Sequence, residues 1–150
     1  MLACLALLGA CRGEDDAAAR ALCAEARLAE VRDPVEGLRL RRRVWEEMPF
    51  TGTAGAASCG REIAERMGRV RLLVSRDERG DPEVVEGCAW ALEAVDVFGA
   101  SAKPPFRKRW AERLLERCLR VVGRAWTRTP GDRRLEELHG RLKRHSSPVE

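Results

Sequence analysis

Few side chains in this chain are of the types that carry out catalysis. Its two histidines, His139 and His145, have no Ser or Cys nucleophile and no carboxylate at a motif spacing. Ser58-Cys59-Gly60 has the composition of a nucleophile turn, but no base accompanies it, and Cys59 falls on an apolar helical stripe. The sequence therefore predicts no catalytic residue and favours a protein that is not an enzyme.

The six cysteines are the other candidates for chemistry. None forms a CxxC pair, no His-x3-His is present, and no Cys lies close to a His. Zinc sites use such spacings because their ligands must converge on one ion. We therefore expect no metal site and no cofactor. In a cytosolic protein the cysteines would be buried thiols that pack as small apolar side chains.

The first residues indicate the compartment. Residues 2–10 are an unbroken run of small and apolar side chains, and charged residues begin at Arg12. This pattern is typical of the apolar part of an export signal followed by a mature start. The run ends in LLGAC, residues 7–11, which resembles the lipobox of bacterial lipoproteins. In that family the cysteine is lipidated and becomes the new N-terminus.

The resemblance implies a signal peptide over residues 1–10, lipidation of Cys11 and an anchor or linker over 11–14. Arg12 follows the cysteine, and the absence of Asp there is what outer-membrane sorting looks like in bacterial lipoproteins. The implied location is the cell envelope, on the outer membrane and facing the periplasm. The alternative is an ordinary first helix in a cytoplasmic protein. No later segment approaches the roughly 18 apolar residues of a membrane span.

Export would also decide how the cysteines are used. Cys4 would leave with the signal and Cys11 would carry the lipid. An even number would then remain in a compartment that permits disulfides. These four cysteines are Cys23, Cys59, Cys88 and Cys118.

No segment alternates with the period of a strand, so the sequence predicts an all-α fold. We expect an up-and-down bundle of five or six helices, in a single domain over residues 11–150. The four tryptophans occupy apolar helical positions, which predicts core packing. The expected helices cover about residues 15–32, 34–48, 58–74, 82–98, 105–127 and 131–144, with a loose tail over 146–150.

Several helix starts carry a capping signal. Asp33-Pro34, Asp81-Pro82 and Thr129-Pro130 each place a capping oxygen before a proline at the first helical position. Ser58 is expected to cap another helix, after a loop of small residues at 49–57.

Short connections make neighbouring helices antiparallel, and this selects among the three possible disulfide pairings. Cys88 and Cys118 lie 11 and 13 residues from the turn at 99–105, so both are about 16–20 Å from it. Pairing Cys59 with Cys88 would instead mismatch the heights by about 10 Å, which is outside disulfide geometry. The sequence therefore predicts Cys88–Cys118 and, by elimination, Cys23–Cys59.

Charge is distributed unevenly along the chain. Residues 103–150 carry 14 Lys and Arg against 6 Asp and Glu, whereas residues 1–102 carry 14 against 18. In the fifth expected helix, five arginines share an arc of about 80° opposite the apolar positions. We call these residues the arginine stripe: Arg109, Arg113, Arg117, Arg120 and Arg124. The stripe has two interpretations. It is a solvated face whose cations are Arg because GC-rich genomes favour Arg codons, or it is a surface that binds lipid headgroups or an acidic partner.

Three functions fit these features. The favoured one is a non-catalytic, lipid-anchored helical module of the bacterial cell envelope that binds another protein. Its size, helices and disulfides are similar to those of the helical pilotins, which escort secretins. The second is a cytosolic basic domain that binds nucleic acid, and the third is an envelope enzyme. No feature points to a small-molecule substrate.

Overall fold

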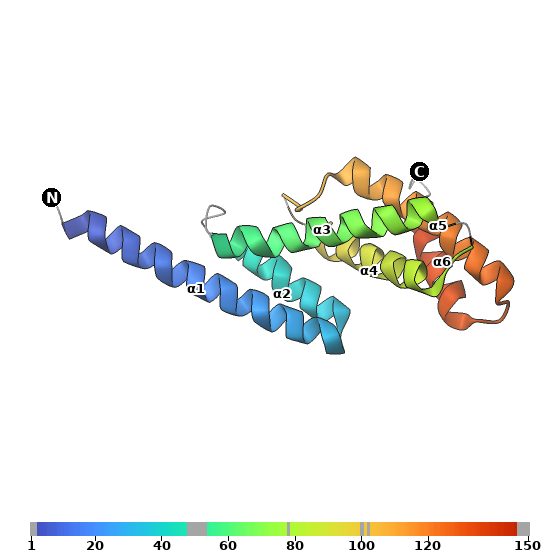
Figure 1. Ribbon diagram of the computed structural model, residues 1–150, viewed down its shortest axis with the longest axis horizontal. Coiled ribbons are helices and arrows are strands. Elements are labelled where there is room, and N and C mark those ends of the chain that lie inside the picture. Colours follow the sequence, from blue (N-terminus) through green and yellow to red (C-terminus); the bar gives the residue numbers. More distant parts are fainter. Residues whose placement is uncertain (1–2, 48–53, 78, 100, 102, 147–150) are drawn as a thin grey trace. The chain divides into compact units, whose positions relative to one another are not determined.

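In a computed structural model, six helices make up the regular structure of the described part of this chain (Figure 1). The structure describes residues 3–47, 54–77, 79–99, 101 and 103–146, and their side chains except those of 3–16, 47 and 54–58. Within these ranges no residue forms a strand, so the all-α prediction is confirmed. The helices are α1 (Ala3–Arg32), α2 (Pro34–Glu47), α3 (Ala54–Arg76), α4 (Pro82–Phe98), α5 (Lys108–Arg128) and α6 (Arg133–Ser146).

Two of the three Xaa-Pro signals mark helix starts as predicted. The Asp33 side chain accepts hydrogen bonds from the backbone N–H groups of Val35, at 3.0 Å, and Glu36, at 3.3 Å. These bonds satisfy donors that have no partner inside α2, which begins at Pro34. Helix α4 begins at Pro82.

The third signal was wrong, because Thr129 ends α5 and does not start α6. Its backbone N–H donates to the carbonyl groups of Ala125 and Trp126. The cap of α6 is Asp132, whose carboxylate accepts hydrogen bonds from the N–H groups of Arg134 and Leu135 at 3.0 and 3.2 Å. A carboxylate directly before the helix supplies this bond without help from the proline.

Two helices begin earlier than the sequence indicated. Helix α1 begins at Ala3, not near residue 15, and includes the expected linker at 11–14. Helix α3 begins at Ala54, so Ser58 lies inside it and is not its cap. Both added segments are rich in Ala, the residue with the highest intrinsic helix propensity. The rest of the predicted loop, 49–53, lies outside the described residues. Of the predicted tail at 146–150, Ser146 is the last residue of α6, and 147–150 lie outside the described residues.

Contacts divide the chain into two compact units. Unit 1 comprises residues 1–63 and 97–105, and unit 2 comprises 64–96 and 106–150. Each unit holds one disulfide, and both predicted pairings are confirmed. Cys23–Cys59 in unit 1 has a Cα–Cα distance of 5.9 Å, and Cys88–Cys118 in unit 2 has one of 5.4 Å.

In unit 1 the hairpin of α1 and α2 packs closely around a small core. Gly37 of α2 lies so near α1 that a Cβ atom there would overlap the Glu30 side chain and lie 2.9 Å from the Ala26 carbonyl oxygen. Leu22 packs against the buried cluster of this unit. The cluster consists of Ala19, Cys23, Val44 and Cys59.

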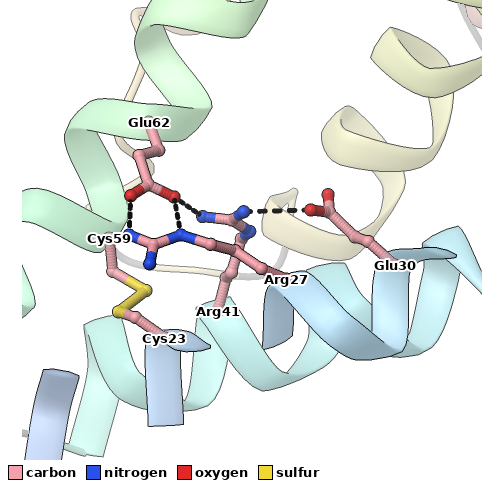
Figure 2. Close-up of a disulfide and its surroundings, with 6 residues drawn as sticks. All are labelled: Cys23, Arg27, Glu30, Arg41, Cys59 and Glu62. Carbon is pink, nitrogen blue, oxygen red and sulfur yellow. Dashed lines mark hydrogen bonds and ion pairs between the residues drawn. A yellow bond between two sulfur atoms is a disulfide. The ribbon is translucent and has the colours of Figure 1, made fainter. Parts of the chain in front are cut away.

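Beside this core, a charged network ties three helices together (Figure 2). Arg41 of α2 is only 6% exposed, and its guanidinium donates to Glu30 of α1, at 2.9 Å, and to Glu62 of α3. Glu62 also accepts hydrogen bonds from Arg27 of α1. Arg27 and Glu62 lie one helical turn beyond the two cysteines of the disulfide, so the bond and the ion pairs hold the same junction.

In unit 2 the core is built on α4 and on one face of α5. Trp90 of α4 is buried, and the Arg66 guanidinium lies 4.2 Å from the centre of its ring. The other tryptophans are less buried than predicted: Trp45 of unit 1 and Trp110 are half-buried, and Trp126 is 36% exposed. A large indole at the edge of an apolar stripe reaches the surface even when its Cα faces the core.

Candidate anion-binding surface

The arginine stripe lies on the exposed side of α5. All five of its residues are exposed, as the amphipathic pattern predicted. The buried residues of the helix occupy the opposite side. They are Ala111, Leu114, Leu115, Cys118, Val121, Val122 and Ala125. This segregation of cations from apolar residues is typical of a helix that packs on one side only.

A disulfide fixes the rotation of α5 about its own axis. Cys118 lies in the middle of the buried face and is bonded to Cys88 of α4. Because the bond allows little rotation of the backbone that carries it, the opposite side of α5 must face away from α4. The stripe is therefore presented on a cross-linked element and not on a mobile loop.

Within the described chain, Arg124 is the member of the stripe that has a structural contact. The Arg124 guanidinium donates a hydrogen bond to the backbone carbonyl of Asp77, at 3.2 Å, where α3 turns toward α4. The Asp77 side chain is itself buried and accepts bonds from the N–H groups of Gly80, at 2.7 Å, and Asp81, at 3.0 Å. Burial acts to raise the pKa of Asp77, but these bonds and the charge of Arg124 outweigh it and lower the pKa.

Gly80 completes that turn and explains why Arg124 can reach it. Its φ of +75° favours glycine, and a Cβ atom there would lie 2.9 Å from the Val121 carbonyl oxygen and from the Ala125 nitrogen of α5. The turn thus rests directly on α5. We conclude that Arg124 holds this turn, which leaves four stripe residues for a ligand.

Among the described residues, those four arginines have no carboxylate partner. Within the described part of the chain, no ion pair joins Arg109, Arg113, Arg117 or Arg120 to Asp or Glu. Arg113 and Arg117 are one turn apart, at a spacing where like charges repel each other. Their charge is therefore available to an external anion.

The structure adds a sixth arginine from a different helix. Arg71 of α3 lines a cleft of about 290 Å³ together with Arg113 and Arg117 of α5. Trp110 and Leu114 complete the lining of this cleft, which contains no carboxylate. Arg71 was not predicted from the sequence, because the residue pattern of α3 does not specify which helix packs against the side of α3 that carries Arg71.

The structure gives His145 a neighbour that is distant in the sequence. His145 has a carboxylate neighbour in space, since its Nε2 lies 2.7 Å from Asp96 Oδ1, although no carboxylate stands at a motif spacing from it in the sequence. The two residues are 49 positions apart and come together because α6 packs beside α4. Arg141 also binds Asp96, at 3.0 Å, so this carboxylate already holds a cation.

The other candidate groups for catalysis have structural partners. The His139 ring stacks on Trp126 with a centroid distance of 4.9 Å. Cys59, the candidate nucleophile, is bonded to Cys23. Among the described residues, no group of three or more His, Cys, Asp or Glu side chains is placed to hold a metal ion.

Cys11, the expected lipidation site, lies in α1, and its side chain is outside the described part of the structure. Over the described residues, no helix combines the length and the apolar character that crossing a membrane requires.

Comparison with known proteins adds no relative. No family model, no curated protein and no solved structure matches this chain. Its function is therefore inferred from its own residues.

Proposed function

We propose that this chain is a non-catalytic, lipid-anchored helical module of the bacterial cell envelope that binds an acidic protein partner. The observation that carries the proposal is the stripe on α5, four of whose arginines are exposed and face no carboxylate of the described chain. Codon bias accounts for Arg in place of Lys, but not for cations gathered on one arc without an acid among them.

The envelope location is supported by the cysteines. Four of the six form two disulfides, and disulfides persist in oxidising compartments such as the periplasm. Cys11 is left for the lipid that the LLGAC motif implies. Pilotin-like escort of another envelope protein is one form that such a function could take.

The absence of catalysis is supported by the partners of the candidate groups. Cys59 is in a disulfide, His139 stacks on an indole, and Asp96 beside His145 is bound by Arg141. Nucleic-acid binding is the alternative if the chain stays in the cytoplasm.

The anchor is tested by Cys11→Ser in the native host. We expect the wild-type protein in the membrane fraction and the variant in the soluble fraction, because a thioether-linked lipid needs the thiol. Cys4→Ser is the matched control, since a cysteine inside the signal would leave with it and the anchor should be unaffected. A mature wild-type protein that still begins at Met1 and carries no lipid contradicts the proposal.

The binding face is tested with a poly-glutamate peptide as the acidic probe. The triple variant Arg113→Gln, Arg117→Gln and Arg120→Gln should bind it about tenfold more weakly at low salt, because three exposed ion pairs at about 0.5 kcal/mol each are lost. Added salt should reduce the difference.

The control for this test removes the same charge elsewhere. Arg32, Arg61 and Arg69 are exposed residues of α1 and α3, and changing all three to Gln also lowers the net charge by three. Equal loss of binding in the two triple variants would show a response to net charge, and the stripe would then be only a solvated face.

A further inference from the structure

The cleft beside the stripe has a composition that the stripe alone does not explain. Arg113 and Arg117 would be exposed on any solvated face of α5, but Arg71 comes from α3 and lines the same cleft. Three arginines from two helices thus line one space. Like charges brought together in this way repel one another, and an anion among them removes the repulsion.

No ion pair within the described chain neutralises these charges. The cleft is lined by no Asp or Glu, and within the described residues Arg71, Arg113 and Arg117 form no ion pair. The structure contrasts here with Arg134 at the other end of unit 2, which lines a larger cavity of about 390 Å³ and pairs with Glu86 of the same lining at 2.6 Å.

The remaining walls are apolar. They are Leu114, which is 2% exposed, and Trp110, which is half-buried. An aromatic wall next to guanidinium groups can contact the carbon part of a ligand while the cations hold its charged end. The cleft is therefore suited to a small amphiphilic anion.

We propose that this cleft binds a phosphomonoester, with the phosphate held by Arg71, Arg113 and Arg117 and the organic part against Trp110. A phosphomonoester carries a charge of about −1.5 to −2 and three terminal oxygens, and guanidinium forks match these oxygens in pairs. A single carboxylate offers two oxygens and one charge, so it would leave part of this donor set unused.

The phosphomonoester can come from two sources, a soluble metabolite or the headgroup of a lipid such as phosphatidic acid. The site goes beyond the proposed function, because it requires neither the envelope location nor a protein partner. Loss of peptide binding and loss of phosphate binding are separate measurements, so either proposal can fail while the other stands.

The experiment is a titration of the full chain with glycerol 3-phosphate, followed by NMR through the indole N–H signal of Trp110. The signal is assigned with Trp110→Phe, and chloride at equal ionic strength is the reference. We expect a saturable shift that chloride does not produce. Arg71→Gln should weaken binding about tenfold, and Arg113→Gln with Arg117→Gln should weaken it further, because each removes a charge-assisted contact.

The matched control is Arg109→Gln with Arg120→Gln. These residues belong to the same stripe and carry the same charge, but they do not line the cleft. The control should change the affinity less than about threefold. A control that loses as much affinity as Arg113→Gln with Arg117→Gln, or a wild type that responds to phosphate no more than to chloride, overturns the proposal.

Binding to lipid vesicles distinguishes a lipid headgroup from a soluble phosphomonoester. Retention on phosphatidic acid vesicles, but not on phosphatidylcholine vesicles, that Arg71→Gln abolishes would assign the site to a lipid headgroup. Binding of glycerol 3-phosphate without such retention would assign it to a soluble ester. In a third outcome, Arg71→Gln leaves vesicle retention intact and glycerol 3-phosphate causes no shift. The membrane contact would then lie on the stripe, and the cleft would not be a binding site.

Discussion

In unit 1, Arg41 is 6% exposed and lies between the carboxylates of Glu30 and Glu62, whereas in unit 2 Arg113 and Arg117 are exposed and face no carboxylate of the described chain. The residue type is the same in both places. What differs is the set of groups around each guanidinium.

The difference has a physical basis in solvation. A guanidinium taken out of water loses several kcal/mol of hydration and remains charged, so it needs carboxylates around it. An exposed guanidinium stays hydrated and changes the free energy of unfolding little. Arg41 is therefore expected to act on stability and the stripe on binding.

The largest expected effect is that of Arg41→Met. The substitution removes the cation of α2 that pairs with the Glu30 carboxylate, whose side chain is 12% exposed. It also removes one of the two arginines that donate hydrogen bonds to Glu62. Breaking a buried pair by removing one partner costs about 3–5 kcal/mol. We expect a loss of that size in the free energy of unfolding, measured by urea denaturation.

Two further variants sharpen this measurement. Arg39→Met removes an arginine from the exposed side of the same helix, where its pair with Glu36 is 3.8 Å long, and should cost less than about 0.5 kcal/mol. Adding Glu30→Gln to Arg41→Met should recover part of the loss, because the carboxylate that loses Arg41 is then replaced by an uncharged amide. Equal effects of Arg39→Met and Arg41→Met would remove the contrast between buried and exposed arginines.

A smaller effect is expected from pH, through Glu62. Its pKa is lowered, chiefly by the hydrogen bond from Arg27; burial acts in the opposite direction, and Arg41 adds to the lowering. A carboxylate with a lowered pKa stabilises the fold above its unfolded value near 4.5, and this contribution is lost as the pH falls toward the lower folded value.

We therefore expect the wild type to lose stability in acid more steeply than Glu62→Gln, which has no proton to take up at this site. Urea denaturation at a series of pH values below 5 measures the two slopes. Arg27→Gln should also flatten the wild-type slope, because it removes the largest cause of the lowered pKa. Parallel slopes for the three proteins would show that Glu62 does not contribute.

Local signals made much of the fold predictable. Asp33-Pro34 and Asp81-Pro82 placed the starts of α2 and α4 at the correct residue, because capping and proline geometry act within one turn. The pairing of Cys88 with Cys118 followed from residue counts on the two sides of a turn, since helical rise converts sequence distance into height. The exposed face of α5 followed from its period.

The features that sequence reasoning missed depend on contacts between distant residues. Arg71 reaches the cleft, and His145 reaches Asp96, through packing of helices that no local pattern specifies. The network around Arg41 joins three helices in the same way. The wrong cap at Thr129 is different in kind, because two local signals competed and the carboxylate of Asp132 prevailed.

The smallest effect on stability is expected from the stripe variant Arg113→Gln, Arg117→Gln and Arg120→Gln. Its free energy of unfolding should lie within about 0.5 kcal/mol of that of the wild type. The sign should be slightly favourable, because the three guanidinium groups are spaced at i, i+4 and i, i+3, where each repulsion costs about 0.2–0.5 kcal/mol. Urea denaturation beside Arg41→Met measures it, and helical circular dichroism should be unchanged. A loss above about 1 kcal/mol would mean that these arginines hold the fold, as Arg41 and Arg124 do, and that weaker binding by the variant reflects a damaged unit 2. A neutral result together with weaker binding would show that the exposed arginines of α5 act on a ligand and not on the fold.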